Sequence, residues 1–104
     1  MKNIDKRAIE YVVAHLDNTI VAKIILFGSK ARGDDDEESD IDLLIITNSK
    51  LSWHSECELL NIVHDAELKY GVIFGAIVFD AEYWRLQPDN SPFKQRIIAE
   101  GKAT

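Results

Sequence analysis

The chain has 104 residues, of which 46% are apolar and 29% are charged, with a formal net charge of -6 and one cysteine. This length predicts a single domain over residues 1–104 whose apolar core folds without disulfide bonds, and Cys57 has no partner for one. No signal peptide is recognisable, and no apolar run approaches the roughly 20 residues of a membrane-spanning helix, so we expect a cytoplasmic protein that does not enter a membrane.

The order of helical and strand patterns indicates the fold. In chain order, the predicted elements are a helix from Asn3 to about residue 17, a strand over 19–27, a helical turn over 29–32, a strand over 41–47, a helix between Ser52 and Gly71, a strand over 72–79, a short turn or helix near 82–85, and a helix from Ser91-Pro92 to Gly101. Serine caps the start of two of these helices and glycine marks their ends.

This order predicts an α/β (α+β) fold in which helices flank a small mixed sheet. The long helix between the second and third strands is a crossover that makes these two strands parallel. About 13 residues join the first two strands, so their relative direction stays open.

The acidity of the chain is concentrated in one segment. Residues 30–42 contain seven acidic and two basic side chains, whereas the rest of the chain is close to neutral. We expect the acidic run 34–38 to be a solvated loop. Because no basic face is visible, we expect no binding to long nucleic acid.

Asp40 and Asp42 form a candidate metal-binding pair. They alternate at the start of the second strand, so both side chains lie on one face, with Cα atoms about 6.6 Å apart. Two carboxylates at this separation repel by roughly 2–3 kcal/mol at an effective dielectric constant near 20. A divalent cation removes that cost, and oxygen ligands suit Mg²⁺. The alternative is plain surface alternation, but Leu44 and Ile46 continue the same face as apolar residues, as at the rim of a site.

Gly28-Ser29 is a candidate phosphate-binding bend between the first strand and the helical turn. Glycine lets the backbone approach a ligand closely, and free N–H groups at the start of a helix attract phosphate. The Ser29 hydroxyl adds a donor, and Arg32, one turn later, can bind a phosphate or a carboxylate. Phosphoryl or nucleotidyl transfer requires at least hydrogen-bond donors that bind phosphate, next to a pair of acidic residues that holds a metal ion.

One motif of the chain resembles the signature of the DNA-polymerase-β-type nucleotidyltransferase superfamily. It consists of Gly28-Ser29, ten further residues and then Asp40-Ile41-Asp42. The short length and the sequence Gly-Ser-Lys-Ala-Arg-Gly over 28–33 are similar to its minimal nucleotidyltransferases, which include the MntA-like antitoxins. A weaker similarity covers the C-terminal part, at 82–84, 91–97 and 100–101.

The resemblance implies a polymerase-β-like fold with Mg²⁺ and ATP or another NTP at one edge of the sheet. Gly28, Ser29 and Arg32 would bind the nucleotide, and Asp40 and Asp42 would hold the metal and act as the catalytic carboxylates. It further implies an antitoxin whose partner is a small helical HEPN-type toxin, and some members of the group transfer AMP to a tyrosine of that partner. Whether the chain forms a homo-oligomer stays open.

The chain departs from the superfamily pattern at one position. The third carboxylate of the superfamily sits on a later strand, and alignment through Glu82-Tyr83-Trp84 places this position at Gly75. Asp80 is near in sequence but has the opposite parity. Two functions therefore stay open: an enzyme that transfers AMP to a hydroxyl group, and an antitoxin subunit that binds nucleotide but is catalytically weak or inactive.

Overall fold

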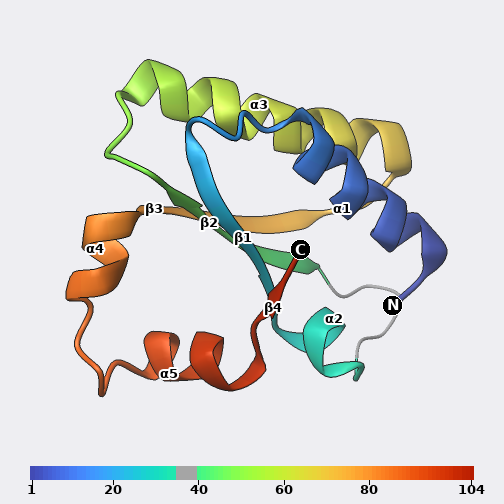
Figure 1. Ribbon diagram of the computed structural model, residues 1–104. Helices are drawn as coiled ribbons and strands as arrows, with labels where there is room; N and C mark the ends of the chain where they lie inside the picture. The colour runs from blue at the N-terminus through green and yellow to red at the C-terminus, as the bar shows by residue number, and fades with distance from the viewer. Residues whose placement is uncertain (35–39) are drawn as a thin grey trace.

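A four-stranded mixed sheet lies at the centre of the computed structural model (Figure 1), which describes residues 1–34 and 40–104. Its strands are β1 (Val21–Phe27), β2 (Ile41–Thr47), β3 (Phe74–Asp80) and β4 (Lys102–Ala103), in the order β3-β2-β1-β4. β2 and β3 are parallel, as the crossover predicts, and β1 runs antiparallel to both β2 and β4. Most of the acidic run 34–38 lies outside the described residues.

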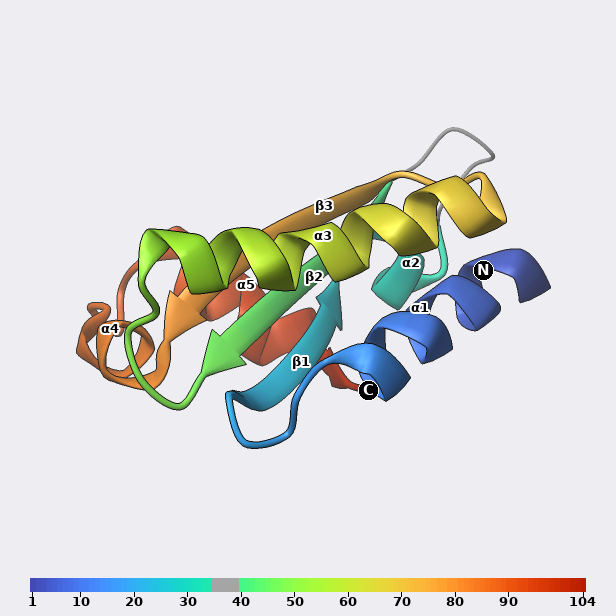
Figure 2. The ribbon, with the colours of Figure 1, turned by 90° about the horizontal axis from the view of Figure 1, so that it is seen from above.

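Within residues 1–34 and 40–104, the sheet is accompanied by the helices α1 (Asn3–His15), α2 (Ser29–Arg32), α3 (Trp53–Tyr70), α4 (Ala81–Leu86) and α5 (Pro92–Glu100). α1 and α3 cover one face, and α4 and α5 lie on the other (Figures 1 and 2). The mixed sheet flanked by helices confirms the predicted fold class. None of the helices in the described part of the chain is both long enough and apolar enough to cross a membrane.

The helix ends follow the local signals in the sequence. Ser52 Oγ accepts a hydrogen bond from the backbone N–H of Ser55 at 3.1 Å, and Gly71 ends α3 in the left-handed conformation, with φ at +66°. Asn3, which we expected to cap the first helix, is instead the first residue of that helix, and Lys2 is its N-cap. The backbone N–H of Lys2 donates to the carboxylate of Asp5 at 3.1 Å.

The two faces of β2 bury two separate apolar clusters. Leu43 and Ile45 pack with α1 and α3, whereas Leu44 and Ile46 pack with residues of α4 and α5. Asp42 has the same parity as Leu44, so its side chain lies on the α4–α5 face of the sheet. The fold therefore brings the last helix of the chain to the same side as this carboxylate.

Candidate active site

The bend at Gly28 connects the end of β1 to α2. Gly28 has φ at +76°, a conformation that strongly favours glycine, and its carbonyl oxygen accepts hydrogen bonds from the N–H groups of Ala31 and Arg32 at 3.1 and 3.0 Å. These bonds close the helical turn that the sequence predicts, and they leave Ser29 as its first residue.

Asp42 lies between two glycines, Gly28 in the bend that follows β1 and Gly75 in β3. Phe27, which precedes Gly28, pairs with Asp42 on one side, and Gly75 pairs with it on the other. A Cβ at Gly28 would overlap Asp42 Oδ2, and a Cβ at Gly75 would lie 2.7 Å from Asp42 Oδ1. Each carboxylate oxygen therefore occupies the space that a side chain would take on the neighbouring strand.

The environment of Asp42 raises the pKa of its carboxyl group above the ordinary value, because burial makes the ionised form less favourable than it is in water. Burial raises the pKa of Asp42, and the negative charges of Asp40 and Glu100 act in the same direction, while Arg96 and Arg32 partly oppose them. No described residue donates a hydrogen bond to this carboxylate. A bound cation would stabilise its ionised form.

Asp40 precedes β2 and is exposed. Its charge acts on Asp42, so the two carboxylates are electrostatic neighbours, as their alternation predicts. The structure thus brings Asp40, Asp42, Gly28 and Ser29 to one end of the sheet, at the junction of β1, α2 and β2.

Arg32 reaches a carboxylate that sequence reasoning did not identify. Its Nη1 donates to both oxygens of Glu100, at 3.1 and 3.2 Å, and its Nε donates to Asp34 at 3.2 Å. Glu100 Oε1 also accepts a hydrogen bond from the backbone N–H of Gly28 at 3.2 Å and one from Arg96 Nε at 2.8 Å. Glu100 therefore connects α5 through hydrogen bonds to the candidate phosphate-binding bend at Gly28-Ser29.

The inward-facing side of α5 carries the signal that could have identified Arg96 and Glu100. Phe93 and Ile97 belong to the apolar cluster beneath the sheet, and Ile97 is buried there. Arg96 and Glu100 follow Phe93 by three and seven residues, so they lie near its side of the helix. Arg96 is exposed and Glu100 is partly buried, so the pair lies at the edge of this apolar cluster.

Lys30, in the middle of the predicted phosphate-binding turn, points away from the candidate site. Its Nζ forms a buried salt bridge with Asp5 Oδ2 at 3.0 Å, and both side chains are almost completely inaccessible. This ion pair fastens α2 to α1, so Lys30 positions the turn and is not available as a phosphate ligand.

The donor set at Asp40 and Asp42 fits Mg²⁺ when the cation is shared with a phosphate. Both residues offer hard carboxylate oxygens, and those of Asp42 are partly buried without a protein donor in the described part of the chain. Within residues 1–34 and 40–104, no group of three or more His, Cys, Asp and Glu side chains is arranged around a common cation position. Mg²⁺ is commonly held by one or two carboxylates together with substrate phosphates and water, which suits an open pair.

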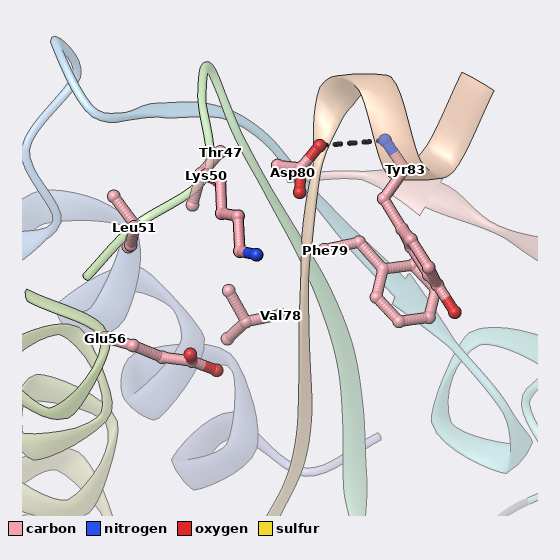
Figure 3. Close-up of a pocket in the computed structure, with 8 residues that line it drawn as sticks. All are labelled: Thr47, Lys50, Leu51, Glu56, Val78, Phe79, Asp80 and Tyr83. Carbon is pink, nitrogen blue, oxygen red and sulfur yellow. Dashed lines mark hydrogen bonds between the residues drawn. The ribbon is translucent and has the colours of Figure 1, made fainter. Parts of the chain in front are cut away.

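A cavity of about 420 Å³ lies at the opposite end of β2 and β3 (Figure 3). It is lined by Thr47, Lys50, Leu51, Glu56, Val78, Phe79, Asp80 and Tyr83. Asp80 pairs in register with Thr47, five residues along β2 from Asp42, and its carboxylate accepts a hydrogen bond from the backbone N–H of Tyr83. Asp80 is therefore about 16 Å from the acid pair at 3.3 Å per residue. It does not replace the carboxylate that is missing at Gly75.

Comparisons of sequence show the family of the chain. Residues 10–103 match the family model described as "Polymerase beta, Nucleotidyltransferase". A relative from Methanocaldococcus jannaschii named "Putative protein adenylyltransferase MJ0604" is 39% identical over 82 residues, which cover 79% of this chain and 76% of the relative. A second relative from this organism, named "Putative protein adenylyltransferase MJ0141", is 39% identical over 57 residues, which cover 55% of this chain and 58% of the relative.

Solved structures of similar fold come from toxin–antitoxin systems. A crystal structure of a toxin–antitoxin with AMP-PNP has a TM-score of 0.57 and 22% identity, over 98% of this chain and 72% of the solved chain. A mutant of the toxin–antitoxin MntA–HpeT has a TM-score of 0.62 and 18% identity, over 100% of this chain and 72% of the solved chain. At these identities the likeness concerns the fold.

Proposed function

The chain belongs to the polymerase beta nucleotidyltransferase family, and from this premise we propose that it transfers an adenylyl group from ATP to a hydroxyl group of a protein. We further propose that residues 1–104 form one nucleotidyltransferase domain that acts in the cytoplasm as an antitoxin. Its acceptor would be a small helical toxin of the HEPN type.

The position of Asp42 against the bend at Gly28 carries this proposal. The two residues are so close that Gly28 has no room for a Cβ beside Asp42 Oδ2. A metal ligand and a phosphate-binding bend must be neighbours if one cation is to contact both a carboxylate and the nucleotide. Transfer from a nucleotide requires this contact.

The proposed roles follow from the elements that carry the residues. Gly28 lets the nucleotide approach the bend, the hydroxyl of Ser29 binds phosphate oxygens with Arg32 alongside, and Asp40 and Asp42 hold Mg²⁺. When bound, the cation neutralises phosphate charge and draws electron density from the reacting phosphorus. The protein side chains hold the triphosphate in line with the acceptor, which is most of what a phosphoryl-transfer site contributes.

The reaction is a substitution at the α-phosphorus of ATP. The acceptor oxygen forms a bond to this phosphorus, and the bond from phosphorus to the oxygen bridging the α- and β-phosphates breaks. Pyrophosphate leaves with the electron pair of that bond, and the proton of the acceptor hydroxyl passes to water. Because Gly75 stands where a third carboxylate is expected, no residue of β3 takes up this proton in the arrangement described above.

The relatives named as protein adenylyltransferases support ATP as the donor and a protein as the acceptor. The fold neighbours from toxin–antitoxin systems, one of them solved with AMP-PNP, support a toxin partner and an adenine nucleotide.

Label transfer tests the proposal. The purified chain is mixed with the helical protein encoded by the adjacent reading frame, Mg²⁺ and ATP labelled at the α-phosphate. We expect label on the partner with the wild type and with Asp65→Ala, an exposed carboxylate on α3, and none with Asp42→Ala. Equal labelling by the wild type and Asp42→Ala, or none by either, would overturn the proposed activity.

A second candidate function rests on Gly75. The missing third carboxylate favours an antitoxin subunit that neutralises its partner by stoichiometric binding, with a nucleotide site that is weak or inactive. In that case the double variant Asp40→Ala/Asp42→Ala still suppresses the toxin in cells. Loss of suppression by the double variant, when it still folds and still binds the toxin, excludes this second function.

A further inference from the structure

Arg96 is a cation at the candidate site that neither the sequence motif nor the proposed roles include. It extends from α5, and its Cζ lies 5.5 Å from the centroid of the Phe27 ring. Phe27 pairs with Asp42 and directly precedes Gly28. Of the charged side chains that affect the pKa of Asp42, Arg96 has the largest effect. Arg96 therefore lies near Asp42 and the bend.

The guanidinium of Arg96 is held from one side and open on the other. Its Nε donates to Glu100 Oε1 at 2.8 Å, and no acceptor in the described part of the chain contacts its two terminal nitrogens. A guanidinium has five N–H donors, so four of them stay available for a ligand. Arg32 differs, because Glu100 and Asp34 already occupy its Nη1 and Nε.

Glu100 fixes the direction of Arg96. Its side chain is 18% exposed and accepts from Arg96, from Arg32 and from the backbone of Gly28. Interactions with these three donors lower the pKa of Glu100, with the Arg96 hydrogen bond as the largest cause, so the carboxylate is ionised at neutral pH. Because one ionised carboxylate accepts from both guanidinium groups and from the bend, it fixes the positions of these three donors relative to one another.

A nucleotide brings further negative charge to a site that already contains the carboxyl groups of Asp40, Asp42 and Glu100. A triphosphate adds about four negative charges, which Mg²⁺ and the nearby arginines Arg32 and Arg96 would offset. An arginine with an open, pre-positioned edge matches the geometry of phosphate oxygens and binds them through two parallel N–H donors.

We propose that Arg96 binds the phosphate chain of the nucleoside triphosphate and that Glu100 is its positioning residue. This inference rests on the proposed function, because it adds a phosphate ligand to the same nucleotide site. Arg96 would then distinguish a triphosphate from a nucleoside, while the base and ribose bind elsewhere in the site.

Binding of two probes by the full chain tests this inference. The dissociation constants of ATP with Mg²⁺ and of adenosine are measured by calorimetry for the wild type, Arg96→Ala, Arg96→Lys and Arg85→Ala. Arg85 is an exposed arginine on α4 and serves as the matched control. We expect Arg96→Ala to weaken ATP binding about 10-fold or more and adenosine binding less than 2-fold. The ATP affinity of Arg96→Lys should lie between those of the wild type and Arg96→Ala. The ATP affinity of Arg85→Ala should equal that of the wild type.

A purely structural role of Arg96 gives a different result. It would lower the affinity for ATP and adenosine in parallel, or lower only the melting temperature, and either outcome overturns the inference. Glu100→Gln keeps an acceptor for the N–H of Gly28 but loses the negative charge. It should therefore weaken the binding of ATP more than the binding of adenosine, with a smaller effect than Arg96→Ala. If the wild type itself does not bind ATP, the proposed function fails; if the wild type binds and Arg96→Ala binds equally, only the present inference fails.

Discussion

Asp42 Oδ1 lies 2.7 Å from the position that a Cβ on Gly75 would occupy, and the two residues are register partners on the parallel strands β2 and β3. The position at which the family resemblance places a third carboxylate is therefore next to Asp42, and Asp42 itself partly fills it. Glycine at this position lets the Asp42 carboxylate extend over β3.

Gly75→Ala should displace the Asp42 carboxylate. A Cβ contact of 2.7 Å forces the side chain of Asp42 to move, so we expect adenylyl transfer to fall at least 10-fold and the free energy of unfolding to fall by about 1–2 kcal/mol. Denaturant unfolding and label transfer measure the two effects.

A double-mutant cycle identifies the cause of that loss. In an Asp42→Ala background the same Gly75→Ala substitution meets no carboxylate, so it should be neutral or stabilise β3 by up to about 1 kcal/mol. An equal destabilisation in both backgrounds would show that the cost arises elsewhere.

Asp42→Asn should stabilise the protein while it abolishes transfer. Burial raises the pKa of Asp42, so the folded state binds this proton more tightly than the unfolded state does, and stability at this site declines as pH rises through the raised pKa. At pH 7 the free energy of unfolding of the variant should therefore exceed that of the wild type by about 0.5 kcal/mol, which is within the range for single polar substitutions. At about pH 3, where the wild-type carboxyl is also neutral, the difference should disappear. Asp65→Asn on exposed α3 is the control, and a stability gain of equal size in that variant would contradict the assignment to Asp42.

Binding of ATP with Mg²⁺ should weaken as pH falls through the raised pKa of Asp42. A protonated carboxyl group does not hold a cation, so proton and metal compete for the same oxygens. Affinities measured as the pH is lowered from neutral towards the ordinary aspartate range near pH 4 should decline more steeply for the wild type than for Asp42→Asn, which lacks this titrating ligand. Parallel curves for the two proteins would mean that Asp42 does not ligate the metal.

Lys30→Met should destabilise the fold without removing a nucleotide ligand. Loss of the lysine leaves the buried Asp5 carboxyl group with the backbone N–H of Lys2 but without its cation, at a cost of up to about 3–5 kcal/mol. The double variant Lys30→Met/Asp5→Leu should recover most of this loss. Lys23→Met, on an exposed position of β1, should stay within about 0.5 kcal/mol of the wild type by denaturant unfolding. If the double variant is no more stable than Lys30→Met, the salt bridge is not the source of the cost.

The sequence by itself determined the elements of the fold and the family. β2 and α3 have their predicted bounds because the signals are local: a β-branched apolar run, a serine cap and a glycine stop. The two-residue strand β4 was not predicted, because so short a segment has no periodicity and is defined only by its pairing with β1.

The motif also indicated the candidate residues Gly28, Ser29, Asp40 and Asp42, since their spacing along one bend and one strand reflects local geometry. Local geometry does not reveal partners from distant parts of the chain. Lys30 belongs to the same motif, yet its charge is directed to Asp5 in α1.

Only the tertiary structure decided how the acid pair is surrounded. Glu100 contacts the bend across 72 positions of the chain, and Gly75 meets Asp42 through the parallel pairing of β2 and β3. Such contacts depend on how α5 packs beneath the sheet and on strand register, and both are set by the burial of apolar side chains on two faces at once. The sequence of any single segment contains no information on these distances, because the partners come together only when the core forms.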